Sequence, residues 1–148
     1  MGNPFVHIEL ASSDIGAAKK FYKALFDWKL QDTPMGEGMV YTMLGVGTGT
    51  GGGMMQAHGA QPTAWLPYVE VADVAKTLEK ARANGAQVII DRKAIGENMG
   101  AFGVITDPQG AALGLWEAAK KAPAKRAAAA KKPAKKAAKK AAKKKGKR

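Results

Sequence analysis

The segment PFVHIELASSDIGAAKKFYKALFDWKL, residues 4–30, decides the fold of this chain. Its first part alternates between apolar and polar residues, which places His7 and Glu9 on one side of a predicted strand and Ile8 on the other. Asp14 offers a side-chain acceptor to the first amides of a helix. The following apolar residues recur at the spacing of one helix face, with lysines between them. The segment therefore predicts a strand, a helix and the start of a second strand.

The same plan returns 59 residues further along the chain. A strand is predicted at Trp65–Val71 and a helix at Asp73–Asn84, with Gly85 as its left-handed C-cap. Leu66 takes the place in the second copy that His7 has in the first. A repeat of this length predicts two equivalent structural units.

Further strands complete each unit. The first has strands at Trp28–Thr33 and Met39–Leu44, a turn at Pro34–Gly38, and a short strand that ends at Met54, Met55 and Gln56. The second has strands at Gln87–Asp91, Ala101–Thr106 and Ala112–Glu117, the last two joined by an Asp-Pro-Gln-Gly turn. The predicted fold class is α+β, with two βαβββ modules, residues 1–60 and 61–118, that close around a cavity and carry their helices outside.

A glycine-rich run, residues 45–53, separates two strands of the first module. Phosphate-binding glycine loops lead into a helix, and no helical pattern follows this run. The run therefore predicts a flexible hairpin connection rather than a phosphate site.

The charge of the chain is divided between two parts. Residues 1–118 hold nine Lys and Arg and twelve Asp and Glu, whereas residues 119–148 hold fifteen basic residues and no acidic one. The chain has no cysteine, which excludes disulfides and thiolate metal sites. Because neither a signal peptide nor an 18-residue apolar stretch is visible, we expect a cytoplasmic protein with no membrane partner.

Three motifs resemble the vicinal oxygen chelate superfamily, which includes glyoxalase I, extradiol dioxygenases and antibiotic-resistance proteins. They are FYKALFDW (residues 21–28), YVEVADV (residues 68–74) and DPQGAALGLWE (residues 107–117). The resemblance covers residues 4–118 and is greatest to the small glyoxalase-like proteins. It implies paired βαβββ modules and a small-molecule cavity, but no single activity, since the scaffold hosts several chemistries as well as metal-free binders.

The resemblance also implies a metal site with one ligand from the first and one from the last strand of each module. These positions fall on His7, Glu117, Leu66 and, depending on the alignment, Gln56 or Met55. The expected ligands of a divalent Zn, Ni, Mn or Fe ion are therefore His7, Gln56 and Glu117, with Glu117 as the candidate catalytic carboxylate of a lyase or dioxygenase. Because Leu66 cannot bind a metal, we expect glyoxalase I activity to be absent or feeble.

A metal-free interpretation stays open beside this one. In it, neutral His7 is hydrogen-bonded to a carboxylate, either Glu117 or Glu9. Four further side chains are expected to line the cavity: Glu9, Tyr41, Tyr68 and Phe102. The two modules close within one chain or exchange between two chains of a homodimer.

The last thirty residues, AKKAPAKRAAAAKKPAKKAAKKAAKKKGKR, are expected to form no core and to be disordered on their own. In composition they resemble the tails of histone H1-like proteins. Eight lysines recur at four-residue steps: Lys131, Lys135, Lys139 and Lys143, and Lys132, Lys136, Lys140 and Lys144. We expect them to bind DNA or RNA through phosphates without reading sequence, which would place the protein at the nucleoid. The alternatives are a solvated tail and a non-enzymatic ligand-binding domain that the tail tethers to nucleic acid.

Overall fold

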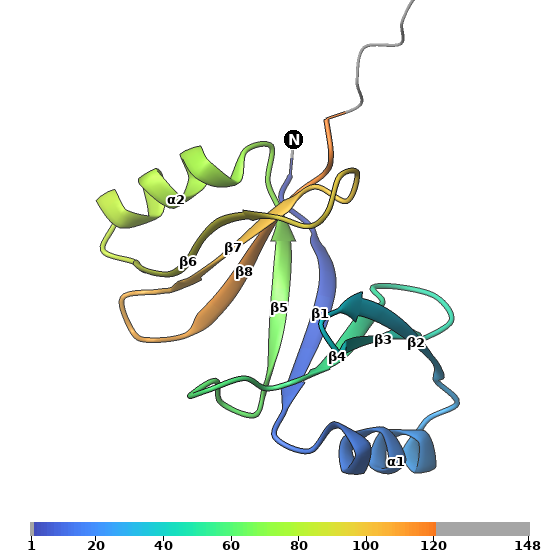
Figure 1. Ribbon diagram of the computed structural model, residues 1–148. Helices are drawn as coiled ribbons and strands as arrows, with labels where there is room; N and C mark the ends of the chain where they lie inside the picture. Colours follow the sequence, from blue (N-terminus) through green and yellow to red (C-terminus); the bar gives the residue numbers. More distant parts are fainter. Residues whose placement is uncertain (1, 121–148) are drawn as a thin grey trace, which may run out of the picture.

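The computed structural model describes residues 2–120, which form one eight-stranded sheet and two helices (Figure 1). The predicted α+β class is confirmed. The elements in chain order are β1 (Phe5–Ser12), α1 (Ile15–Leu25), β2 (Lys29–Gly36), β3 (Met39–Gly45), β4 (Gly52–Gln56), β5 (Ala64–Glu70), α2 (Val74–Ala83), β6 (Gln87–Ala94), β7 (Ala101–Thr106) and β8 (Ala112–Glu117).

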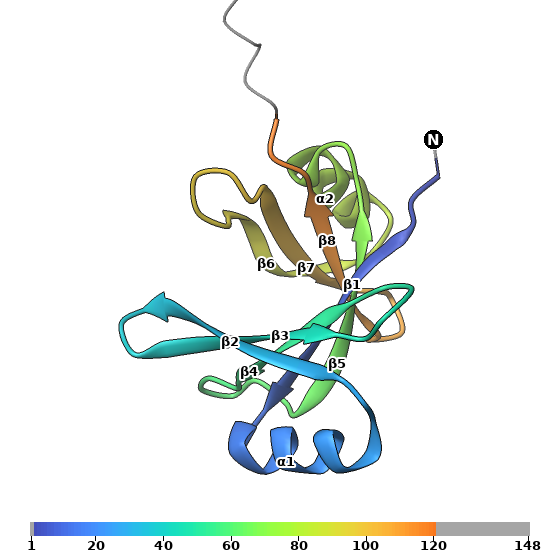
Figure 2. The ribbon, with the colours of Figure 1, turned by 90° about the vertical axis from the view of Figure 1, so that its right-hand side faces the viewer.

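The strand order in the sheet is β2-β3-β4-β1-β5-β8-β7-β6, so each half of the chain contributes four neighbouring strands. β1 and β5 pair antiparallel at the centre and join the halves. Each also pairs in parallel with the last strand of its own half, β1 with β4 and β5 with β8. The sheet is strongly twisted, and the two helices lie at opposite ends of it (Figures 1 and 2).

Each helix packs on its own half of the sheet through a separate apolar cluster. Leu10, Leu44 and Met54 are buried under α1, and Tyr22 and Ala18 pack against them. The cluster under α2 consists of Val71, Val74, Leu78 and Leu115, of which Val74 and Leu78 belong to the helix itself. We call the face of the sheet that bears the helices the outer face and the opposite one the inner face.

Caps and turns set the helix boundaries. Asp14 and Asp73 cap α1 and α2, each accepting a hydrogen bond from the amide three residues on. Gly85 has a φ of 88°, as its predicted C-cap role requires.

The predicted turn at Pro34–Gly38 begins too early. β2 continues to Gly36, and Gly36, Glu37 and Gly38 make the turn with positive φ. Pro34 is tolerated because β2 is an edge strand, where a missing amide donor breaks no ladder on the open side. β6 likewise runs to Ala94, beyond its predicted end at Asp91.

No helix within residues 2–120 is long and apolar enough to cross a membrane.

Candidate functional site

Four polar side chains meet on the inner face and form one hydrogen-bonded chain. The Nε2 atom of His7 lies 2.7 Å from the hydroxyl of Tyr41. That hydroxyl donates to Oε2 of Glu9 at 2.9 Å, and the hydroxyl of Tyr68 donates to Oε1 of Glu9 at 3.2 Å. We call His7, Glu9, Tyr41 and Tyr68 the inner-face cluster.

Strand alternation places this cluster on the inner face. His7 and Glu9 alternate along β1 with Ile8 and with Leu10, which is buried under α1. Tyr68 on β5 is the cross-strand partner of His7, and the two rings meet edge to face with centroids 5.9 Å apart. Three strands, β1, β3 and β5, therefore supply the cluster.

Phe102 lies next to the cluster. Its ring meets that of Tyr68 edge to face, with centroids 6.4 Å apart. The structure thus brings the four predicted cavity residues, Glu9, Tyr41, Tyr68 and Phe102, onto the same face as His7.

The electrostatics of the cluster fix where its protons are. Burial lowers the pKa of His7, and the nearby Glu9 carboxylate opposes this shift. Burial, followed by the charge of Glu9, raises the pKa of Tyr41 and of Tyr68 far above the usual value of a tyrosine. Both hydroxyls therefore stay protonated and donate to Glu9.

This assignment determines the tautomer of His7. Since the single hydroxyl proton of Tyr41 is donated to Glu9, the Tyr41 oxygen accepts from Nε2–H of His7. Neutral His7 then carries a lone pair on Nδ1, and Nδ1 makes no hydrogen bond to any of residues 2–120. The cluster thus presents a nitrogen that can accept a proton.

Glu117 lies on the outer face, away from His7. Its carboxylate is buried, with 5% of the residue exposed. Oε2 accepts from the backbone N–H of Val74 at 2.6 Å, at the first turn of α2. Oε1 accepts from Nε of Arg92 at 3.0 Å and from a second guanidinium nitrogen of the same residue. The Arg92 guanidinium holds the pKa of Glu117 below its usual range.

Gln56 has the matching role in the first half of the chain. Its Oε1 accepts from the N–H of Ile15, the first residue of α1, at 3.3 Å, and its Nε2 donates to the carbonyl of Ser13 at 2.7 Å. The two predicted metal ligands from the last strands, Gln56 and Glu117, thus bind the starts of α1 and α2.

The structure therefore corrects the expected ligand set of His7, Gln56 and Glu117. Glu117 is two residues after Leu115, and Gln56 is two residues after Met54; both of these apolar residues are buried under a helix. Because side chains of a strand alternate, Gln56 and Glu117 share the outer face with them, while His7 is on the inner face.

Two inner-face positions, Gly53 on β4 and Gly114 on β8, are glycines. A Cβ atom at Gly53 would overlap the ring of Tyr41, and one at Gly114 would overlap the ring of Tyr68. No group of three or more His, Cys, Asp or Glu side chains among residues 2–120 could hold a metal ion. The side chains around His7 therefore do not fit a divalent metal, which takes about three protein ligands in a catalytic site.

The expected enclosed cavity also differs from the observed hollows. Two pockets lie on the outer face, one between β1, β3 and β4 and the other beside α1. None of Glu9, Tyr41, Tyr68 and Phe102 lines either pocket.

The sequence interpretation missed Arg92 and the two inner-face glycines. Arg92 follows the predicted end of its strand, so nothing pointed to a partner for it. The glycines could have been found, because counting back from Leu115 or Met54 by one residue gives a position on the opposite face.

Replacing Gly114 by alanine is expected to displace the Tyr68 ring and lower the free energy of unfolding by roughly 1–3 kcal/mol, as overpacking usually does. Chemical denaturation of wild type and variant measures the change. The matched control is Gly16→Ala in α1, where a Cβ meets only a carboxylate oxygen of Asp14 at 3.4 Å and alanine favours the helix. Equal stability of wild type and the Gly114 variant would contradict the close contact with Tyr68.

The fold is that of a vicinal oxygen chelate domain. A family model described as the Glyoxalase/Bleomycin resistance protein/Dioxygenase superfamily matches residues 5–115, and the chain belongs to that family. Among curated proteins it is similar to CFP32, a glyoxylase by name, from Mycobacterium bovis and Mycobacterium tuberculosis. The identity is 39% over 116 residues, which is 75% of this chain and 44% of the relative. The chain thus spans less than half the length of these relatives.

Solved structures share the fold at low identity. A hypothetical protein, BH1468, from Bacillus halodurans has a TM-score of 0.61 at 17% identity, with 83% of this chain and 99% of that one covered. Methylmalonyl-CoA epimerase from Mycobacterium tuberculosis has a TM-score of 0.57 at 18% identity, with 79% and 89% covered. At this identity the likeness supports the fold alone.

Proposed function

We propose that the domain binds a small carbonyl-bearing molecule on its inner face and that His7 accepts a proton from it. The observation that carries this proposal is the hydrogen-bonded chain from His7 through Tyr41 to Glu9. The chain orients the imidazole, fixes its proton on Nε2 and leaves Nδ1 as the base.

The protonation states of the cluster suit a role for His7 as a base. A general base must be unprotonated before it reacts, and burial, by lowering the pKa of His7, favours the neutral imidazole. Tyr41 and Glu9 stabilise the imidazolium that forms on proton transfer, because the Tyr41 oxygen accepts from Nε2–H and the Glu9 charge lies behind it. The name of the curated relative, a glyoxylase, supports a carbonyl compound as the ligand.

The metal-dependent lyase or dioxygenase that the sequence suggested has less support. Its proposed ligands Gln56 and Glu117 are hydrogen-bonded to the starts of α1 and α2 on the outer face. Members of the family commonly use a divalent metal, but the donors around His7 are two tyrosines and one carboxylate. The proposed mechanism therefore uses the side chains of the cluster alone.

The proposal is tested by hydrogen exchange in D2O, with methylmalonyl-CoA and the hemithioacetal of methylglyoxal and glutathione as probes. We expect the wild type to exchange the carbon-bound proton next to the carbonyl of at least one probe, and His7→Gln to lose this exchange. Tyr41→Phe is expected to retain binding but exchange more slowly, since Nε2–H loses its acceptor. His58→Gln, in the linker between β4 and β5, is the matched control. Exchange that is absent from the wild type, or equal in wild type and His7→Gln, would contradict the proposal.

Conversion of the same hemithioacetal to a glyoxalase I product is expected to be absent or feeble. The inner face lacks the carboxylates that a metal would need beside His7, because Gly53 and Gly114 stand there. The assay is run with and without added Zn or Ni. Robust turnover that His7→Ala abolishes would show that a metal site assembles after all.

His7 is expected to titrate below the ordinary histidine value of about 6.5. The NMR ring signals of His7 and His58, the two histidines of the chain, report the midpoints separately. Because burial disfavours protonation in the folded state, the unfolded state binds more protons below about pH 6.5, and stability falls as the pH falls there. Glu9→Gln should lower the midpoint of His7 further, since the carboxylate raises it. A midpoint at or above 6.5 would contradict the burial of His7.

A second proposal concerns the basic tail, most of which lies outside the described residues. Fifteen basic residues without an acidic one favour binding to nucleic acid phosphates and hence a role as a tethered ligand-binding domain. The cytoplasmic location, the association with the nucleoid and the homodimer stay predictions.

A further inference from the structure

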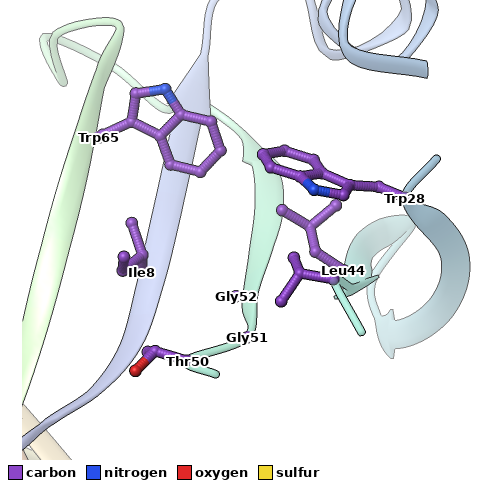
Figure 3. A pocket seen from close by; sticks show the side chains of 8 residues that line it. Ile8, Trp28, Leu44, Thr50, Gly51, Gly52 and Trp65 are labelled. Atoms are coloured by element: carbon purple, nitrogen blue, oxygen red, sulfur yellow. The ribbon is translucent and has the colours of Figure 1, made fainter. Parts of the chain in front are cut away.

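A pocket of about 170 Å³ opens on the outer face of the first half of the sheet. Trp28 and Trp65 flank its upper side, and Ile8 and Leu44 stand below them over the glycine backbone of β4 (Figure 3). Val46 and Thr50 complete the wall. The pocket backs onto the inner-face cluster, since Ile8 and His7 are neighbours on β1 with side chains on opposite faces.

The pocket exists because one position in a row of side chains is glycine. Gly52 is the cross-strand partner of Ile8 on β1 and of Leu44 on β3. In the second half of the chain, Leu113 takes the corresponding place on β8, four residues before Glu117 as Gly52 is four before Gln56. A leucine-sized volume that is filled in one half is therefore open in the other.

No side chain on β4 can fill the pocket at position 52. A Cβ atom at Gly52 would overlap the backbone carbonyl of Ile8, because β1 and β4 approach closely there. A hydrogen bond joins the two strands at the neighbouring residue, where the Gly51 carbonyl accepts from the N–H of Ile8 at 3.2 Å. The vacancy is thus a consequence of the close approach of the Gly52 backbone to the carbonyl of Ile8.

The chemistry of the wall selects the ligand. The rings of Trp28 and Trp65 stand at 86° with centroids 6.3 Å apart, and the Trp65 indole N–H donates to the Tyr22 hydroxyl at 3.1 Å, which holds the ring in place. No charged residue lines the pocket, and its hydroxyl group is that of Thr50, which donates to the Phe5 carbonyl at 3.3 Å. An apolar cavity of about 150 Å³ in another protein is known to bind benzene.

We propose that this pocket binds a flat, uncharged aromatic molecule of one or two fused rings, with at most one hydroxyl group directed to Thr50. Perpendicular indole faces offer edge-to-face contacts to a ring. Burying a charged group against Ile8, Leu44 and Val46 would cost its hydration without a partner, so charged aromatics are rejected. The site is independent of the proton transfer proposed at His7.

Phenol is the probe, and benzoate is its charged counterpart with the same ring. The chain has three tryptophans, so three indole N–H signals are resolved in a nitrogen–proton NMR spectrum. Trp28 and Trp65 line the pocket, whereas Trp116 is on β8 and donates to the Met99 carbonyl. We expect phenol to shift the Trp28 and Trp65 signals to saturation and to leave the Trp116 signal in place. Benzoate at the same concentrations should shift none of them.

Ile8→Phe fills the pocket from β1 and is expected to abolish the response to phenol. The matched control is Ile89→Phe, the same substitution at an exposed isoleucine of β6 that does not line the pocket. An Ile8→Phe variant whose spectrum shows loss of folding is replaced by Val46→Phe. Equal shifts of all three tryptophans, shifts that grow linearly without saturation, or an unchanged response in the filled variant would overturn the proposal. If diluting the protein without phenol shifts the Trp28 and Trp65 signals and lowers its molecular mass in solution, this face is instead an interface with a second copy of the chain.

Discussion

Replacing Glu117 by alanine is expected to lower the free energy of unfolding by about 1–3 kcal/mol, because the buried N–H of Val74 loses its acceptor. The hydrogen bond from this N–H to Oε2 is 2.6 Å long and lies at the first turn of α2, where backbone donors have no partner within the helix. The substitution should also remove the ion pair with Arg92, which links β6 to β8. Chemical denaturation measures the change.

Two further variants separate the parts of this contact. Glu117→Gln keeps an acceptor for Val74 and, in the first half of the chain, glutamine occupies the corresponding position, so a smaller loss is expected. Glu70→Ala is the matched control, since Glu70 also ends a strand and its side chain makes no hydrogen bond within residues 2–120. A loss for Glu70→Ala as large as that for Glu117→Ala would contradict a specific cap.

The contribution of Glu117 should depend on pH. Arg92 holds the pKa of Glu117 below its usual range in the folded protein. A group of this kind stabilises the fold fully above its unfolded pKa of about 4.3 and loses that contribution as the pH falls through the lower folded value. Glu117→Gln should therefore resemble the wild type more closely at low pH than at pH 7.

The repeat made most of the fold predictable. An alternating strand followed by a capped helix is a local pattern. Because this pattern occurs twice, 59 residues apart, the sequence predicts two equivalent units. Strand ends were less predictable: the continuation of β2 past Pro34 depends on β2 being an edge strand, which is a property of the whole sheet.

The inner-face part of the site was predictable from the sequence. Alternation puts His7 and Glu9 on the side away from Leu10, and the structure brings the expected cavity residues Tyr41 and Tyr68 beside them. Glu117 was predicted as a ligand because it ends the DPQGAALGLWE motif. Strand alternation would instead have placed it on the same face as Leu115, which is the face that α2 covers. Arg92 could not be assigned, because its partner is 25 residues away in sequence.

Deleting the basic tail is expected to remove the affinity of the protein for DNA. Residues 119–148 carry fifteen positive charges, whereas the preceding 118 residues have a net charge of −3. A protein that neutralises phosphates releases their counterions, so its affinity falls steeply as salt rises. With roughly six to ten phosphate contacts, affinity should drop about 10³–10⁵-fold between 50 and 200 mM salt.

The measurement compares full-length protein with a truncation to residues 1–118, on duplexes of unrelated sequence and at several salt concentrations. Replacing the eight periodic lysines, Lys131, Lys132, Lys135, Lys136, Lys139, Lys140, Lys143 and Lys144, by glutamine preserves the length and is expected to reduce the salt slope in proportion to the charges removed. Because the tail contains no aromatic or amide side chain that could read bases, duplex sequence should not matter. Equal binding by the truncation, a flat salt dependence, or a marked preference for one duplex would reject phosphate binding by the tail.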